Sequence, residues 1–135
     1  MLDKCSGLIS SDENPNNVKA FNDSVKELPK KFREKLRYEQ LSAEDMVKQG
    51  HLTLKAKADV VIVDPPQKGC DNVVVKAING CKAKTLVYVS CGFEAFMKDL
   101  KRLKEEGGRR FKVAEEHVLF PGADAIETLA VMERD

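Results

Sequence analysis

Four residues of this chain have side chains that could do chemistry, and each stands beside an apolar run: Asp12, Asp64, Cys91 and Glu127. A cysteine thiolate is a strong nucleophile, and a carboxylate can remove a proton or accept hydrogen bonds from a ribose. Each residue also has an ordinary interpretation, because carboxylates commonly cap turns or end strands in water and a lone cysteine is most often a packed thiol. Their positions in the fold therefore decide between the two.

The first half of the chain predicts a strand followed by a helix. "SGLIS", residues 6–10, is a short apolar strand that stops at the turn-rich segment around Asp12. The next segment begins near Pro15 and places apolar side chains at helical spacing until Pro29 ends the pattern. A weaker segment follows, in which "LRYEQLS" predicts an edge strand and "AEDMVKQ" a short helical turn.

The second half predicts a regular alternation of strands and helices. "DVVIVDPP", residues 59–66, is a β-branched run typical of a strand buried on both faces, and "TLVYVSC", residues 85–91, is a second one. The segment between them is expected to be a crossover helix in spite of its three valines. An amphipathic helix and two strands complete the chain, at residues 93–108, 111–120 and 126–134. These elements predict an α/β fold with an open, mostly parallel sheet that ends in an antiparallel hairpin.

In open α/β sheets ligands bind beyond the carboxyl ends of the strands. Asp12, Asp64 and Cys91 each follow a predicted strand, and the corner "FPGADAIE" brings Glu127 to the same edge. The two prolines after Asp64 stiffen its loop, so the carboxylate is expected to point outward. The combination of the four residues is more informative than any member, and it predicts a site at this edge.

Composition narrows the classes of partner. The chain has 135 residues, enough for one domain, and its 23 Lys and Arg balance 22 Asp and Glu. This balance excludes the overall basic excess of a nucleic-acid coat protein, so any binding of a polyanion must be local. The four cysteines form no CxxC pair and have no histidine at ligand spacing, so no metal is expected. No leader or membrane-spanning run is recognised, so we expect an intracellular protein without a membrane partner.

Basic residues gather in residues 98–112 and are the candidates for contact with a polyanion such as a nucleic acid. Such charges on an amphipathic helix are more often a solvated face, and Glu105 and Glu106 dilute them. The candidates are Lys98, Lys101, Arg102, Lys104, Arg109, Arg110 and Lys112.

The order of five motifs resembles one family. The motifs are "SSDENPNNV", "AEDM", "VIVDPPQKG", "VYVSCGF" and "LFPGADAIETLAVMER". They are similar to the C-terminal part of the RNA (uracil-5)-methyltransferases, which use S-adenosylmethionine to make 5-methyluridine in tRNA and rRNA. The resemblance runs over nearly the whole chain. It implies a Rossmann-like methyltransferase fold, S-adenosyl-L-methionine as cofactor and RNA as partner.

The resemblance also assigns roles by position. It implies that Cys91 is the covalent nucleophile and that Glu127 is the general base. It places Asp64 in the pocket of the target base and beside the cofactor, and gives Asp12 to the cofactor ribose. A cytosine-5-methyltransferase would want a cysteine at Gln67, and an amino-directed enzyme an aromatic residue there, so neither class fits as well.

Several features depart from the family pattern. The family usually has Arg at the position of Gln67 and Asn-Pro at the position of Gly92-Phe93, and Ala123 and Ala125 replace a frequent Thr and His. The family's first strand and glycine-rich loop would precede Met1. The chain is therefore expected to be one partial domain, with the rest of the cofactor-binding half in 1–57 and the target-base half in 58–135.

Two consequences of the missing strand are expected as alternatives. Either the strands that end at Asp12 and Asp64 pair directly, or another chain fills the gap between them. The departures also leave a second function open, that of a catalytically inactive remnant that binds RNA or a partner chain.

Overall fold

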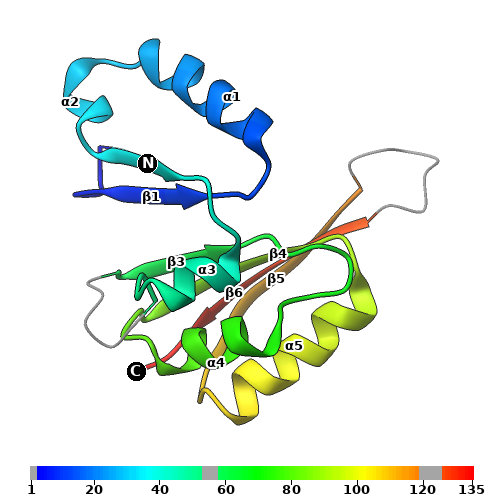
Figure 1. Ribbon diagram of the computed structural model, residues 1–135. Helices are drawn as coiled ribbons and strands as arrows, with labels where there is room; N and C mark the ends of the chain where they lie inside the picture. Colours follow the sequence, from blue (N-terminus) through cyan, green and yellow to red (C-terminus); the bar gives the residue numbers. More distant parts are fainter. Residues whose placement is uncertain (1–2, 53–57, 119–125) are drawn as a thin grey trace. The chain divides into compact units, whose positions relative to one another are not determined.

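The computed structural model describes residues 3–52, 58–118 and 126–135 (Figure 1). These residues form two compact units, Met1–Gln49 and Gly50–Asp135. No helix among the described residues is long and apolar enough to span a membrane. The division of labour expected for residues 1–57 and 58–135 stays a prediction.

The first unit is built around two parallel strands, β1 (Leu8–Ser11) and β2 (Leu36–Glu39). Helix α1 (Pro15–Lys26) connects them, and two short helices complete the unit, α2 (Lys30–Arg33) and α3 (Ala43–Lys48). The sequence predicted all of these elements except α2.

Local contacts explain where α1 begins and what it packs against. The Asn14 side chain caps the helix by accepting a hydrogen bond from the Asn16 N–H, and Pro15 takes the first turn, where its missing donor costs nothing. Further along, the ring of Phe21 lies 5.0 Å from that of Tyr38, between centroids, so α1 is held to β2 by an aromatic contact.

The second unit contains a four-stranded sheet. Its strands are β3 (Val60–Val63), β4 (Thr85–Ser90), β5 (Arg110–Val118) and β6 (Ile126–Glu133), in the spatial order β3-β4-β6-β5. β3 and β4 are parallel, whereas β6 is antiparallel to both of its neighbours. The predicted α/β fold with a C-terminal antiparallel hairpin is confirmed. The corner predicted at 120–125 lies outside the described residues.

Helices α4 (Asn72–Gly80) and α5 (Phe93–Glu105) pack on one face of this sheet (Figure 1). The alternation of a strand sends every second side chain to that face. Among the described residues, the buried side chains of the sheet are Val61 of β3, Leu86, Tyr88 and Ser90 of β4, and Thr128, Ala130 and Met132 of β6. The helices contribute Val74, Val75, Ile78, Phe96, Leu100 and Leu103. The core of the unit therefore lies between the two helices and this single face.

A buried arginine ties the far end of the core together. The guanidinium of Arg109 donates hydrogen bonds to the carbonyl oxygens of Ile78 at 3.2 Å, Ala83 at 3.0 Å and Lys84 at 3.2 Å. Burial, aided by the charge of Arg134, lowers the pKa of Arg109. Arg109 is thus a structural residue that satisfies carbonyls at the end of α4, and it is not available to RNA.

Direct pairing of the strands ending at Asp12 and Asp64, one of the two expected alternatives, is not found among the described residues. There β1 pairs only with β2, and β3 pairs only with β4 and lies in the other unit. One edge of β3 is consequently unpaired in the described part of the chain, and Val60 and Ile62 of that strand are about half exposed.

Candidate functional site

The register of β4 and β6 brings two predicted site residues together. The last pair of this ladder is Ser90 with Thr128. Cys91 follows Ser90 in a bend, and Glu127 precedes Thr128 in β6. Glu127 is half-buried and the Cys91 side chain is exposed. A thiol and a carboxylate therefore flank the last pair of the β4–β6 ladder.

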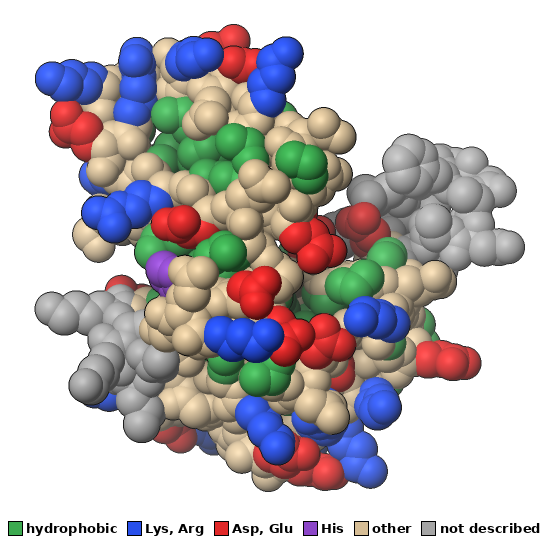
Figure 2. Space-filling model, in the orientation of Figure 1, with side chains coloured by type: hydrophobic (Ala, Val, Ile, Leu, Met, Phe, Trp, Pro, Cys, Tyr) green, Lys and Arg blue, Asp and Glu red, His purple; other side chains and the backbone are tan. Residues whose placement is uncertain are grey.

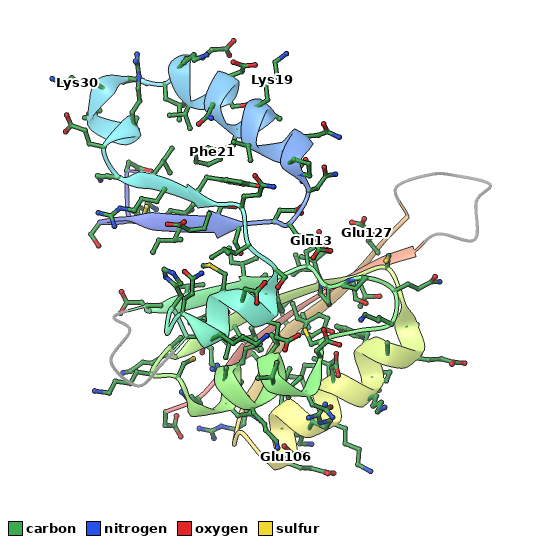
Figure 3. All side chains as sticks on the ribbon, viewed as in Figure 1. Glu13, Lys19, Phe21, Lys30, Glu106 and Glu127 are labelled. Atoms are coloured by element: carbon green, nitrogen blue, oxygen red, sulfur yellow. The ribbon has the colours of Figure 1, made fainter. Side chains whose placement is uncertain are left out.

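Asp64 belongs to the same edge of the sheet. The parallel ladder ends with Val63 beside Tyr88, and Asp64 follows directly as an exposed residue. Successive side chains of a strand point to opposite faces of the sheet. Val61 and Thr128 are buried under α4 and α5, so their neighbours Ile62 and Glu127 lie on the opposite, open face. If the alternation continues past the end of β3, Asp64 lies on this open face as well. In Figure 3 Glu127 points away from α5, as its place on the open face requires. The structure thus brings three of the four predicted residues to one edge.

The bend that carries Cys91 is fixed by its neighbours. The Ser90 hydroxyl accepts a hydrogen bond from the Gly92 N–H at 3.1 Å and donates to the Gly92 carbonyl at 3.2 Å. A serine that bonds to its own backbone two residues on stabilises a tight turn. Cys91 therefore sits at the outer point of a turn that Ser90 closes from the buried side.

Gly92 is also in contact with the loop that carries Asp64. A Cβ atom at position 92 would lie 2.3 Å from the Gln67 carbonyl oxygen, closer than any side chain permits. The backbone of Gly92 itself has φ −124°, which any residue can adopt, so the requirement for glycine is the close approach alone. Gln67 and Gly92, the two positions that depart from the family pattern, are thus in contact with each other.

Gly92→Ala is expected to destabilise the protein by about 1–3 kcal/mol, because the loop at Gln67 must move to accept the methyl group. The matched control is Gly80→Ala, since a Cβ at that helical glycine meets nothing within 4 Å. This control should be neutral or stabilising by up to about 1 kcal/mol. Chemical denaturation of both variants measures the difference, and equal stabilities would contradict the close approach.

The other thiols of the described residues are less suited to be nucleophiles. Cys81 is buried, and Cys5 and Cys70 are half-buried. Burial raises the pKa of Cys70 to about 11, which leaves little thiolate near neutral pH. Cys91 is the exposed thiol of this set.

Asp12 lies at the end of β1 in the first unit. Its Oδ1 atom accepts a hydrogen bond from the Asn14 N–H at 2.7 Å, so the carboxylate stabilises the turn before α1. Among the described residues, no hydrogen bond reaches its second oxygen. The ordinary interpretation of Asp12 is therefore supported, and an acceptor is left over on an exposed side chain.

The structure sorts the basic residues considered for RNA contact. Arg109 is buried, Arg110 pairs with Asp135, and Lys112 pairs with Glu133 at 3.0 Å. Arg102 contacts three partners on neighbouring turns and helices: Asn72 at 3.0 Å, Glu106 at 3.7 Å and Asp99 at 4.0 Å. In the described part of the chain, Lys98, Lys101 and Lys104 form no ion pair and remain exposed.

The surface as a whole carries mixed charge. Figure 2 shows Lys and Arg side chains interspersed with Asp and Glu on the visible face of each unit. A surface hollow is lined by residues at the end of the β5–β6 hairpin away from Glu127, among them Arg110, Lys112 and Glu133. Among the described residues no cluster of His, Cys, Asp and Glu could hold a metal ion.

Ser90 and Asp99 hydrogen-bond to the backbone of the segments beside Cys91 and Asp64, at Gly92 and Cys70 respectively, and the sequence reasoning missed both. Signals for both exist in the sequence. Asp99 falls on the helical stripe of Phe96, Leu100 and Leu103, where an acidic residue is out of place unless it has buried partners. Ser90 stands two residues before a glycine at a strand end, which is a turn pattern.

Comparison with known proteins finds relatives over nearly the whole chain. An uncharacterized RNA methyltransferase of Protochlamydia amoebophila is 33% identical over 131 residues, which are 97% of this chain and 33% of that protein. An uncharacterized RNA methyltransferase of Caldanaerobacter subterraneus is 44% identical over 78 residues, which are 58% of this chain and 17% of that protein. The chain thus spans a third or less of the length of these relatives. No family model matches it.

Solved structures that resemble this chain are also methyltransferases or share their fold. The chain is similar to Pyrococcus abyssi tRNA (uracil-54, C5)-methyltransferase in complex with S-adenosyl-L-homocysteine, with a TM-score of 0.73 and 26% identity over 93% of this chain and 28% of that one. The Methanococcus jannaschii fibrillarin pre-rRNA processing protein superposes with a TM-score of 0.63 at 16% identity, covering 94% of this chain and 55% of that one. The second likeness concerns the fold alone, and together they identify a Rossmann-like S-adenosylmethionine-dependent methyltransferase fold.

Proposed function

We propose that this chain is part of the catalytic domain of an RNA methyltransferase, and that this enzyme methylates carbon-5 of uridine in RNA. The observation that carries the proposal is an exposed thiol, Cys91, and a carboxylate, Glu127, each next to the last pair of the β4–β6 ladder. The likeness to a tRNA (uracil-54, C5)-methyltransferase supports the same reaction. The match covers only 33% of the Protochlamydia protein, which supports the proposal that the chain is part of a longer catalytic domain.

A thiol beside a carboxylate suits this chemistry. Carbon-5 of uracil is a poor nucleophile until a thiolate adds to carbon-6. The Cys91 sulfur forms a bond to carbon-6, and the electrons of the carbon-5 to carbon-6 double bond move onto the ring as an enolate. Carbon-5 then takes a methyl group. Glu127 removes the proton of carbon-5, the double bond re-forms, and the carbon-6 to sulfur bond breaks to release the thiolate.

S-adenosyl-L-methionine supplies the methyl group as an electrophilic sulfonium. Asp12 is proposed to bind the cofactor ribose, because its exposed carboxylate can accept a hydrogen bond from a ribose hydroxyl. Asp64 is proposed as a cofactor-binding residue because it is exposed directly after β3. We propose that Asp64 also lines the pocket of the target base.

Part of the RNA contact is proposed to lie on α5. Lys98, Lys101 and Lys104 are exposed cations of this helix, and phosphate contacts of this kind position a nucleic acid without reading its sequence. Phe93 begins the same helix two residues after Cys91 and is 59% exposed, as suits a platform on which a base stacks. The target uridine itself must be flipped out of its stack to reach the thiol.

The unpaired edge of β3 is proposed to receive another strand. Open edges with exposed Val60 and Ile62 are otherwise a site of aggregation. A segment of the longer catalytic domain, or a second chain, would satisfy the backbone groups of this edge.

RNA that contains 5-fluorouridine provides the test. Fluorine at carbon-5 cannot be removed as a proton, so methylation should stall with the RNA bonded to the protein. With S-adenosyl-L-methionine present, we expect a covalent complex on a denaturing gel and mass-spectrometric mapping of the bond to Cys91. Modification at another residue would overturn the proposed mechanism.

A second function would be indicated by a different outcome of the same experiment. If the folded protein binds RNA, forms no adduct and shows no heat of binding with S-adenosylhomocysteine, it acts as an inactive RNA-binding or partner-binding chain. The departures at Gln67 and Gly92 are the observation that favours this function.

A further inference from the structure

A buried carboxylate lies beneath the candidate site. Asp99 is on α5, is 3% exposed, and stands among the apolar residues that face the sheet. A buried charge is costly unless hydrogen bonds compensate for its lost hydration. The partners of Asp99 therefore indicate what this residue holds in place.

The Oδ2 atom of Asp99 accepts two short hydrogen bonds from different elements. The Tyr88 hydroxyl donates at 2.6 Å from β4, and the Cys70 backbone N–H donates at 2.7 Å from the loop after β3. Hydrogen bonds to an ionised acceptor are about twice as strong as neutral ones. The Tyr88 ring is held in turn by an edge contact with Phe96, with centroids 5.4 Å apart. Asp99 thus joins the helix, the strand and the loop at one atom.

The loop is shaped to reach this carboxylate. Gly69 has φ 86°, which favours glycine, and a Cβ there would lie 2.7 Å from the Asp99 Oδ2 atom. The Gly69 N–H donates to the Pro66 carbonyl at 2.8 Å and closes a turn. The Gln67 carbonyl, inside that turn, lies against Gly92. A continuous series of contacts therefore runs from Asp99 through the loop to the bend that carries Cys91.

We propose that Asp99 is a positioning residue for the candidate site, holding the loop of Asp64 against the bend of Cys91. It touches neither of the two reacting side chains and acts through the Cys70 amide and the turn at Gln67. Its effect on methylation rests on the proposed function, whereas its effect on the loop does not. A misplacement of about 1 Å in a reacting group can cost on the order of 100-fold in rate.

Alkylation of Cys70 reports on the loop without any substrate. Burial raises the pKa of this thiol to about 11, so it should react slowly with iodoacetamide at pH 8 while the loop is held. In Asp99→Ala the loop is expected to open, and Cys70 should react at least about tenfold faster, by mass-spectrometric peptide mapping. Asp99→Asn keeps an acceptor oxygen and should fall between the two. Glu105→Ala, an exposed change on the same helix, should leave the rate unchanged.

Covalent trapping of 5-fluorouridine RNA reports on the positions of the reacting groups. Asp99→Ala is expected to lower the rate of adduct formation by about 10–100-fold while RNA affinity stays within twofold, with partial rescue in Asp99→Asn. Circular dichroism at the assay temperature shows which variants are folded. If Asp99→Ala does not fold, Tyr88→Phe replaces it as the test variant. Tyr88→Phe leaves the Cys70 hydrogen bond to Asp99 intact, so it should lower the rate of adduct formation by less than the roughly 10–100-fold expected for Asp99→Ala. If folded Asp99 variants match the wild type in Cys70 alkylation, the proposal is overturned.

The two readouts separate this proposal from the proposed function. A wild-type protein that forms no adduct would contradict the methylation chemistry, and the alkylation rates would still decide whether Asp99 holds the loop. Faster alkylation together with an unchanged adduct rate would overturn the positioning role.

Discussion

Cys91→Ala is expected to abolish the covalent RNA adduct and to lower methyl transfer by at least about 10⁴-fold, as loss of a covalent nucleophile does in other enzymes. The reason is that no other side chain at the end of β4 can add to carbon-6 of uracil. The residue is exposed, so the substitution removes little packing and the fold should be retained. Radiolabelled methyl incorporation into RNA and denaturing gels measure the two effects.

Cys5→Ala is the matched control for Cys91→Ala. Cys5 is a thiol of the first unit, outside the residues assigned to the reaction, and its loss should leave adduct formation unchanged. Cys91→Ser is expected to behave like the alanine variant, because a hydroxyl is hardly ionised at neutral pH. Wild-type turnover in Cys91→Ala would show that the thiol is a surface residue and not the nucleophile.

Glu127→Gln is expected to slow turnover by about 10²–10⁴-fold, which is the usual contribution of a general base. The amide cannot take the proton from carbon-5, so the reaction should stop after methyl transfer with the RNA still bonded to Cys91. The distinctive result is a covalent complex with ordinary uridine RNA, without the fluorinated base. Denaturing gels with S-adenosyl-L-methionine present would detect it.

Glu133→Gln controls for a change of charge on the same strand. Glu133 lies at the opposite end of β6 and pairs with Lys112 on the surface, an interaction worth about 0–1 kcal/mol. This variant should turn over normally and accumulate no adduct. If Glu127→Gln turns over as the wild type does, another group removes the proton and the role given to Glu127 is wrong.

Much of the fold could be predicted from local sequence patterns. The β-branched run before Asp64 and the apolar run before Cys91 form β3 and β4, because such runs are stable only when buried in a sheet. Residues 72–80 form a helix in spite of their valines, since parallel strands need a crossover. The short helix α2 was not predicted, because four residues after a proline carry no periodic signal.

The pairing of the strands was harder to predict from the sequence. A strand's sequence records how deeply it is buried and does not name its neighbour, so the sequence left open whether β1 and β3 pair directly. Among the described residues each of them pairs within its own unit. The interpretation of position 92 changed for a similar reason. In sequence, Gly92 was only a departure from the family's asparagine, whereas in three dimensions glycine is required there by the Gln67 carbonyl.

By itself the sequence determined the fold class, the family resemblance and the identity of the candidate residues Cys91, Glu127 and Asp64, because each follows from the order of motifs at strand ends. Only the tertiary structure decided that Cys91 and Glu127 flank the same strand pair, since their 36-residue separation is closed by the β4–β6 register. It also revealed the hydrogen bonds of Asp99 on which the proposed positioning role rests, because the donors to this buried carboxylate come from other elements.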